Sequence, residues 1–333
     1  MRTKHLVVIG ASAGGIETLR ELVAGLPRDF PAAICVVLHS SPQSPGVLGA
    51  ILTRAGSLPA HNARDRERLE PGHIYVAPPD YHLVIEPGRV RITKGPRENR
   101  FRPAIDPLFR SAAQVYGPAA IGVVLTGNLD DGTAGLWTLK QLGGTAIVQD
   151  PEDALFPSMP RSALEHVRVD FTVPLGQLPS LLVRLTSVEL DSREDITAPE
   201  TVEVEVKIAK EENALDAGLQ QIGDPSKFAC PECHGVLLQI KEGRRMRFRC
   251  HTGHAYSLDS LVAAVNEGIE DGLWNAVRAL EEGHMLMAAM ADHMREHSAS
   301  AAEFLVSRAR EAKEQSDTVR KLVMSREPLA TEA

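Results

Sequence analysis

One turn near the N-terminus constrains the fold of this chain more than any other feature. Residues 6–9 (LVVI) are apolar, residues 10–15 (GASAGG) are small and rich in glycine, and residues 16–26 have helical periodicity. The pattern predicts a buried strand, a tight turn that carries Ser12, and a helix. A serine hydroxyl on such a turn suits a nucleophile, and the same turn suits a phosphate-binding cradle. A plain turn is the third interpretation.

Apolar runs and helical segments continue to alternate over the first half of the chain. A hairpin is predicted where residues 83–86 and 90–93 flank the sequence Pro-Gly-Arg. Further strands are predicted at residues 33–38, 73–77, 120–125 and 145–148, and helices at residues 47–54, 105–115, 133–142, 157–166 and 177–185. Because such alternation produces parallel strand pairs, we expect an α/β fold: a doubly wound, mostly parallel sheet with a β-hairpin.

The length and composition indicate more than one domain. The 333 residues are too many for one ordinary domain, and the 43% hydrophobic content is enough for a substantial core. The composition changes after the α/β pattern ends, because residues 187–218 hold ten acidic and three basic side chains. We expect five segments: an α/β domain (1–186), an acidic linker with an edge strand at residues 203–208 (187–226), a small cysteine module (227–257), a helical region (258–325) and a disordered tail (326–333).

Charge and hydropathy exclude some classes of protein. The formal net charge of -8 argues against general binding to nucleic acid. The N-terminus lacks the apolar segment and cleavage site of a signal peptide. No run approaches the ~18 apolar residues that a membrane span needs. We therefore expect a cytoplasmic protein without membrane insertion.

Three polar side chains follow predicted parallel strands. Ser12 follows the first strand, His39 the second, and Asp131 the strand at residues 120–125. The carboxyl ends of parallel strands meet at one edge of a sheet, where ligands bind. A serine needs a base to become a good nucleophile, histidine is such a base near neutral pH, and a carboxylate orients the imidazole. These residues therefore predict a Ser-His-Asp triad, with Asp130 competing for the third place, whereas a P-loop lysine is missing.

Several short motifs occur together in the first half of the chain. They are GASAGG at residues 10–15, the strand ending at His39, HIYVAPP at 73–79, RPAID at 102–106, LTG at 125–127 with Asp131-Gly132, and MPR at 159–161. In this order they make residues 4–185 resemble the catalytic domain of chemotaxis protein-glutamate methylesterases of the CheB type. The resemblance implies Ser12 as the nucleophile, His39 as the general base and Asp131 as the residue that orients it.

The resemblance also implies a reaction, a partner and further site residues. The family hydrolyses glutamate γ-methyl esters on chemoreceptor helices without a cofactor and releases methanol, and some members deamidate glutamines. Backbone N–H groups near Ala13 and Asn128 are implied to form the oxyanion hole, although the family commonly has threonine and methionine at these two positions. The typical member carries an N-terminal receiver domain, whereas this chain begins at the catalytic domain. We therefore expect no switch by phosphorylation in cis.

Three of the four cysteines cluster late in the chain. Cys230 and Cys233 form a C-x-x-C pair, and Cys250 and His254 follow after a basic strand. Two knuckles with this spacing fit a tetrahedral zinc site. We predict these four residues as ligands of a structural zinc ion. Cys35, in contrast, lies in a predicted buried strand and is expected to be inert.

Other residues of the cysteine module leave alternatives open. His234 and His251 are substitute zinc ligands, and residues 230–234 also have the C-x-x-C-H spacing of c-type haem attachment. Arg245, Arg247 and Arg249 alternate with Met, Phe and Cys, which predicts a strand with one basic face. That face suits nucleic acid, or it is a solvated surface that faces the acidic linker.

Two helical stretches follow the cysteine module. Apolar side chains fall on one face of residues 258–280, and residues 301–323 carry a second apolar pattern. The two stretches predict a helical hairpin or a homo-oligomer interface. They also support an alternative function, in which a catalytically weak protein uses its zinc module and helices as a scaffold to recruit partners.

Overall fold

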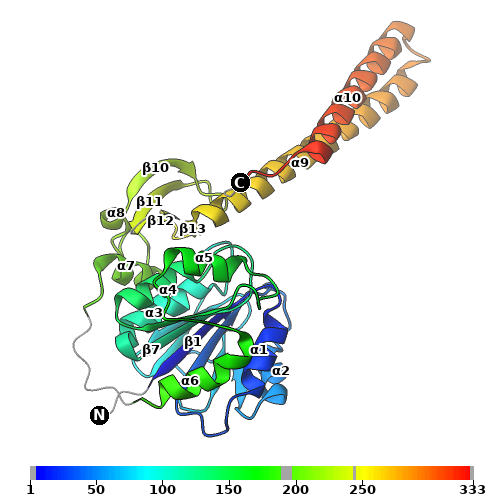
Figure 1. The fold of residues 1–333 in the computed structure, drawn as a ribbon. Coiled ribbons are helices and arrows are strands. Elements are labelled where there is room, and N and C mark those ends of the chain that lie inside the picture. Colours follow the sequence, from blue (N-terminus) through cyan, green and yellow to red (C-terminus); the bar gives the residue numbers. More distant parts are fainter. Residues whose placement is uncertain (1–4, 189–196, 243–244, 331–333) are drawn as a thin grey trace. The chain divides into compact units, whose positions relative to one another are not determined.

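The computed structural model describes residues 5–188, 197–242 and 245–330 (Figure 1). It comprises two compact units, residues 1–260 and residues 261–333. Residues 189–196 of the predicted acidic linker and residues 331–333 of the predicted disordered tail lie outside the described residues.

A seven-stranded parallel sheet forms the centre of the first unit. Every neighbouring pair of strands in it is parallel. In spatial order the strands are β3 (Ala60–Asn62), β4 (Ile74–Val76), β2 (Ala33–Leu38), β1 (Leu6–Ala11), β7 (Ala120–Val124), β8 (Thr145–Gln149) and β9 (Phe171–Val173). The central strands β1 and β7 are buried at every residue, as their continuous apolar sequences require. The predicted fold class is confirmed, whereas the short strands β3 and β9 were not predicted.

Helices cover both faces of the sheet. One hydrophobic core unites the sheet with α3 (Ile105–Tyr116), α4 (Thr133–Gln141) and α5 (Ser158–His166), and with the hairpin of β5 (His82–Glu86) and β6 (Arg89–Thr93). The other core unites the opposite face with α1 (Gly15–Ala24), α2 (Leu48–Ala55) and α6 (Leu178–Thr186). Single 3₁₀ turns lie at Gly117–Ala119 (η1) and Leu175–Gln177 (η2). This two-sided cover is the doubly wound arrangement that the sequence predicts (Figure 1).

The segment predicted as an edge strand is a helix instead. Helix α7 (Glu200–Ala209) contains all of residues 203–208. Val204 and Ile208 pack in one apolar cluster, and Val202 and Val206 pack in another. Each pair is spaced i, i+4 and so lies on one face of the helix. Because the two faces are offset by two residues, the sequence alternates like a strand although the segment is helical.

A four-stranded antiparallel sheet carries the cysteine module. Its strands are β10 (Asp224–Ala229), β11 (Val236–Glu242), β12 (Arg245–Cys250) and β13 (Ala255–Ser257), and the short helix α8 (Leu219–Ile222) precedes them. We call residues 224–260, which include this sheet and the first turn of the next helix, the ribbon module.

The arginines of β12 face the protein interior, so the prediction of a solvent-facing basic surface is wrong. Arg247 and Arg249 are 4% and 0% exposed, whereas Met246 of the supposed apolar face is 44% exposed. Glu205 of α7 accepts hydrogen bonds from both arginines, at 2.5–3.0 Å. Glu98 of the α/β fold accepts a further bond from Arg249 at 2.8 Å and pairs with the buried Arg110. A buried network of charges therefore joins the ribbon module to α7 and the α/β fold.

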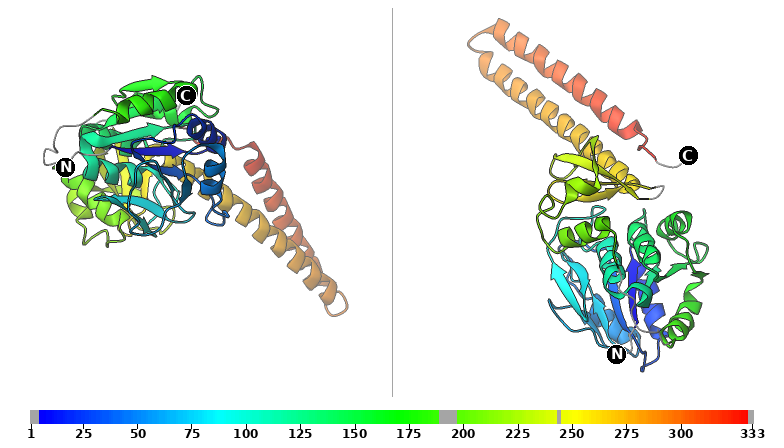
Figure 2. Two further views of the ribbon diagram at one scale, coloured as in Figure 1. Left: turned by 90° about the horizontal axis from the view of Figure 1, so that it is seen from below. Right: turned by 90° about the vertical axis from the view of Figure 1, so that its left-hand side faces the viewer.

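The second unit consists of two long helices. α9 starts at the end of the first unit and spans Leu258–Met294, and α10 spans Ala299–Ser325. They run antiparallel and side by side (Figure 2), and Nδ1 of His284 lies 2.9 Å from the carbonyl oxygen of Ala309. The predicted helical hairpin is therefore present. None of the helices in the described residues is both long enough and apolar enough to cross a membrane.

Candidate active site

The glycine-rich turn holds Ser12 between the end of β1 and the start of α1. The amide N–H of Ser12 donates to the carbonyl of Thr126 (3.0 Å), and its own carbonyl accepts from Gly15 (2.9 Å). Gly14 adopts the left-handed φ of 73°, which a residue with a side chain rarely does. At Gly127, a Cβ atom would lie 2.1 Å from Sδ of Met159 and 2.8 Å from Cβ of Ser12. Glycine at position 127 therefore lets the loop after β7 approach the serine closely.

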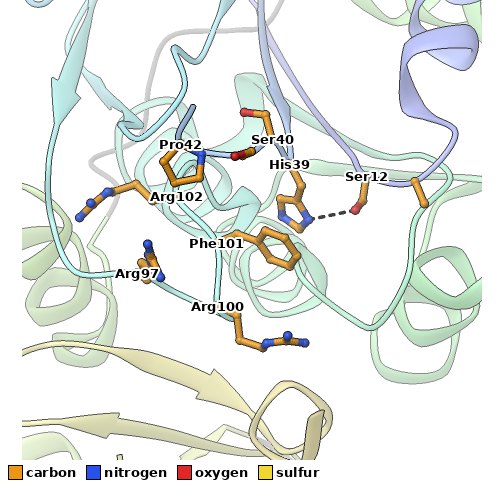
Figure 3. Close-up of a pocket in the computed structure, with 10 residues that line it drawn as sticks. Ser12, His39, Ser40, Pro42, Arg97, Arg100, Phe101 and Arg102 are labelled. Carbon is orange, nitrogen blue, oxygen red and sulfur yellow. Dashed lines mark hydrogen bonds between the residues drawn. The ribbon is translucent and has the colours of Figure 1, made fainter. Parts of the chain in front are cut away.

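The three residues predicted as a triad lie side by side, although they are distant in the sequence. Nδ1 of His39 lies 3.0 Å from Oγ of Ser12, a contact drawn in Figure 3. Nε2 of His39 lies 2.7 Å from Oδ2 of Asp131. The side chains of His39 and Asp131 are only 4% and 2% exposed. The structure thus places a hydroxyl, an imidazole and a carboxylate in one hydrogen-bonded series at the carboxyl edge of the sheet.

The environment of Asp131 keeps its carboxylate ionised. Burial alone would raise the pKa of Asp131, but the hydrogen bond and charge of His39 and the N–H of Ile105 lower it to about 2. The Ile105 N–H donates to Oδ2 at 2.7 Å, and the side chain of Asn99 donates to Oδ1 at 2.8 Å. An ionised carboxylate only accepts hydrogen bonds, so Nε2 of His39 carries the ring proton. Nδ1 then presents its lone pair to the hydroxyl of Ser12.

The structure distinguishes Asp131 from Asp130, the other candidate for the carboxylate that contacts His39. The carboxylate of Asp130 accepts a hydrogen bond of 2.6 Å from the hydroxyl of Ser257 in the ribbon module. Burial, together with the charges of Asp259 and Asp131, raises the pKa of Asp130 to about 6. Of these two carboxylates, it is that of Asp131 that contacts the imidazole. The sequence preference for Asp131 thus agrees with the geometry.

Sequence analysis missed two residues that hold the histidine and the carboxylate. Phe101 stacks on the ring of His39, with centroids 3.8 Å apart and planes at 8° (Figure 3). Asn99 donates from one amide nitrogen to Asp131 and to Asp106, the latter at 3.0 Å. Phe101 directly precedes the RPAID motif at residues 102–106, and Asn99 lies three residues before it. Their position in the sequence, close to a recognised motif, was the signal by which they could have been found.

A cavity of about 430 Å³ opens beside Ser12. Arg97, Arg100 and Arg102 line it with the stacked pair of His39 and Phe101, as Figure 3 shows. Nε and Nη2 of Arg102 donate to the carboxylate of Asp80 at 3.0 and 2.7 Å. The cavity therefore gives access to Ser12 and is lined in part by cationic side chains.

One of the two residues predicted for the oxyanion hole lines the same cavity. Ala13 follows the serine and lines the cavity, and Asn128 is exposed directly after Gly127. Because Gly127 lies close to Ser12, the loop that carries Asn128 lies next to the turn that carries Ala13. The backbone roles assigned to Ala13 and Asn128 stay a prediction.

The four residues predicted as zinc ligands cluster in the ribbon module. Ligand atoms of Cys230, Cys233, Cys250 and His254 all lie within 4.8 Å of one another. Sγ of Cys233 and Cys250 are 3.5 Å apart, and Nδ1 of His254 lies 3.6 and 3.7 Å from Sγ of Cys250 and Cys230. Zinc–sulfur bonds of about 2.3 Å in a tetrahedron separate the ligand atoms by about 3.8 Å, so the spacing fits zinc. Nε2 of His254 also faces a carboxylate oxygen of Glu232 at 3.3 Å, a partner typical of metal-bound histidines.

The first half of the chain is similar to proteins of known family. The family model described as CheB methylesterase matches residues 7–182, which is more than half of the chain. A putative protein-glutamate methylesterase/protein-glutamine glutaminase of Leptospira interrogans is 40% identical over 188 residues, which cover 56% of this chain and 97% of the relative. A protein-glutamate methylesterase/protein-glutamine glutaminase of Thermotoga maritima is 36% identical over 184 residues, 54% of each chain. This chain therefore spans about half the length of that relative.

A solved structure agrees with these similarities. The crystal structure of the Thermotoga maritima CheB methylesterase catalytic domain superimposes with a TM-score of 0.53 and 36% sequence identity. The match covers 56% of this chain and 100% of the solved chain. The family model ends at residue 182, within α6, so the ribbon module and the helical hairpin lie outside the residues that it matches.

Proposed function

This chain belongs to the CheB methylesterase family, and we propose that it is a serine hydrolase that removes methyl esters from glutamate side chains. The observation that carries the proposal is the hydrogen-bonded series of Ser12, His39 and Asp131, which lies wholly within the matched residues 7–182. Methylated chemoreceptors, or similar signalling proteins, are the proposed substrates in the cytoplasm. Because its relatives are also named protein-glutamine glutaminases, we include deamidation of glutamine as a second reaction.

In the proposed reaction, Oγ of Ser12 attacks the ester carbonyl carbon while its proton passes to Nδ1 of His39. Asp131 stabilises the imidazolium that forms. Backbone N–H groups at Ala13 and Asn128 hold the tetrahedral oxyanion, and such a donor contributes about 3–4 kcal/mol in other hydrolases. The ester C–O bond breaks, and methanol leaves with the proton from His39. Water then gives a proton to His39 and attacks the acyl carbon. The bond between that carbon and Oγ of Ser12 breaks, and His39 returns the proton to Oγ, which frees Ser12 and the glutamate carboxyl group.

The alternative prediction of a catalytically weak scaffold is not favoured. The relatives with 36–40% identity are named as enzymes, and the imidazole of His39 is within hydrogen-bonding distance of both the hydroxyl of Ser12 and the carboxylate of Asp131. Ala13 and Asn128, which depart from the common family pattern, are assigned backbone roles that their side chains do not perform.

A direct test measures methanol release from receptor membranes that carry radiolabelled methyl esters. We expect Ser12→Ala to lower the rate about 1,000-fold or more, because loss of a nucleophile removes covalent catalysis. Ser180→Ala is the matched control, since Ser180 is an exposed serine of α6 whose hydroxyl donates to the nearby carbonyl of Gln177. Equal release by the wild type and Ser12→Ala would refute the proposal. Ammonia release from receptors with glutamine at the same sites tests the second reaction.

We also propose that the ribbon module binds one structural zinc ion through Cys230, Cys233, Cys250 and His254. The donor set and its spacing support zinc, and the module is too small to have a large core of its own. The hydrolysis itself needs no metal in this proposal.

Self-association through the helical hairpin is a further proposal. Large apolar side chains of both helices are exposed, including Met285 (60%), Leu286 (58%) and Phe304 (65%). Such side chains are typical of an interface. Light scattering of the purified chain should give a mass above one chain, and the double substitution of Leu286 and Phe304 by glutamate should restore the mass of a monomer. A monomeric wild type would contradict this proposal.

A further inference from the structure

The side chain of Asn99 lies between the candidate active site and the ribbon module. Nδ2 donates to Oδ1 of Asp131 (2.8 Å) and Oδ2 of Asp106 (3.0 Å). Oδ1 accepts from the N–H of Ser257 (2.9 Å) and the hydroxyl of Ser260 (3.1 Å). Asn99 is 5% exposed, and all four hydrogen-bonding positions of its amide are used. The amide nitrogen must face the carboxylates, because the ionised carboxylate of Asp131 only accepts hydrogen bonds, whereas the N–H of Ser257 on the other side only donates.

The backbone around Asn99 extends the sheet of the ribbon module. The N–H of Asn99 donates to the carbonyl of Ala255 (2.8 Å), and the N–H of Ala255 donates to the carbonyl of Arg97 (3.1 Å). On its other side, β13 pairs with β12. Ala255 directly follows His254 of the cysteine–histidine cluster. A displacement of β13 would therefore move the backbone and the side chain of Asn99 together.

The carboxylate of Asp131 links Asn99 to the imidazole of His39. Oδ1 of Asp131 accepts from Asn99, and Oδ2 of the same carboxylate contacts His39. Because a carboxylate is planar, fixing one oxygen also fixes the other. Backbone N–H groups of Ile105 and Gly132 hold the carboxylate as well, at 2.7 and 3.0 Å. Loss of the contacts of Asn99 should therefore lower the activity without abolishing it.

We propose that Asn99 is a positioning residue through which Ser257 and Ser260 of the ribbon module set the orientation of Asp131, and thereby of the His39 ring. This inference rests on the proposed function, in which His39 activates Ser12. It assigns to the ribbon module a part in hydrolysis, because two serines of the module hold the side chain that orients Asp131. The effect of Ser260 passes through Asn99, and this dependence makes the proposal testable.

The test measures labelling of Ser12 in the full chain by a fluorophosphonate, a probe that reacts with activated serines. We expect Ser260→Ala to lower the maximal labelling rate about 3- to 10-fold, the range expected for one lost hydrogen bond, with the half-saturating probe concentration unchanged. Ser226→Ala is the matched control in the ribbon module, because among the described residues the hydroxyl of Ser226 accepts a hydrogen bond from the N–H of its near neighbour Phe228 and has no contact with Asn99. It should be labelled at the wild-type rate. Thermal unfolding of each variant shows that it is folded at the assay temperature.

A double-substitution cycle distinguishes positioning from a general loss of structure. We expect Asn99→Ala to lower the maximal rate roughly 10-fold, and Ser260→Ala to have no further effect in that background. A wild-type rate for Ser260→Ala, or an equal loss in both backgrounds, would overturn the inference. Should Asn99→Ala not fold, the comparison of Ser260→Ala with Ser226→Ala decides alone. A wild type whose labelling does not depend on Ser12 would instead overturn the proposed function, and this inference with it.

Discussion

The ring of His39 stacks on the ring of Phe101, with centroids 3.8 Å apart and planes within 8° of parallel. Hydrogen bonds at Nδ1 and Nε2 hold the imidazole within its plane, and the stack holds the plane itself. Phe101 lies two residues after Asn99, so one loop supports both the histidine and the carboxylate. The precision of the site therefore depends on residues 97–102 as much as on the strand ends that carry the triad.

Removal of the stacked ring should slow the reaction. We expect Phe101→Leu to lower the rate of methanol release about 2- to 10-fold, since an aromatic pair contributes about 0.5–1.5 kcal/mol beyond its buried area. Phe228→Leu is the control, because Phe228 is 53% exposed and packs on Phe248 in the ribbon module. An unchanged maximal rate in Phe101→Leu would show that the hydrogen bonds alone orient His39.

The lowered pKa of Asp131 predicts a loss of stability in acid. Its pKa is about 2 in the folded chain, against an ordinary value of 3.8. A group with a lowered pKa stabilises the folded state above its unfolded pKa, and this contribution is lost as the pH falls from about 4 through about 2. We expect the free energy of unfolding of the wild type to fall by about 2 kcal/mol more than that of Asp131→Asn over this interval. Urea denaturation at pH 5, 4, 3 and 2 measures both, and parallel curves would contradict the prediction.

Substitution of one cysteine should remove the metal. We expect one zinc ion per wild-type chain by mass spectrometry of metals and none, or much less, in Cys250→Ser, because a structural site needs all four ligands. The Cys250→Ser ribbon module should also unfold at a lower denaturant concentration, since metal binding contributes to folding. Cys35→Ala is the control: Cys35 is buried in β2, and its pKa is raised by burial. A zinc content that does not depend on Cys250 would exclude the predicted ligand set.

The buried charge network predicts a large effect of one glutamate. Glu205 pairs with Arg247 and Arg249 and lies 3.7 Å from Nε of Arg110. We expect Glu205→Ala to lower the free energy of unfolding by about 3–5 kcal/mol, because it removes a counter-charge that three buried arginines share, while Glu98 and Glu242 remain as partners. Glu203→Ala on the exposed side of the same helix is the control, with an effect of about 0.5 kcal/mol or less. Similar effects of both substitutions would contradict the buried network.

The α/β fold was predictable because its signals are local. The apolar run at residues 33–38 coincides with β2, since a strand buried on both faces is continuously hydrophobic. Because ligands bind at the carboxyl ends of parallel strands, the sequence also predicted that Ser12, His39 and Asp131 lie at one edge of the sheet. The helix α7 was not predictable in this way, because two faces of i, i+4 pairs imitate the alternation of a strand.

The support of the site was not predictable from local pattern. Asn99 and Phe101 lie in an irregular loop, and their partners are remote: Asn99 contacts Ser260, 161 residues further along the chain. The arginines of β12 were misplaced for the same reason, since their counter-charges Glu98 and Glu205 lie in other segments. Contacts of this kind depend on the tertiary fold and leave no periodic signal.

The backbone pairing between Ala255 and residues 97–99 has a consequence for anyone who wishes to shorten this protein. A fragment ending at α6 would retain Ser12, His39 and Asp131, yet it would leave Asn99 without two of its four side-chain hydrogen bonds and without its backbone bond to Ala255, and Glu98 without Arg249. A piece that keeps these contacts of Asn99 and Glu98 therefore has to extend to Ser260, well past residue 182, where the match to the family model ends.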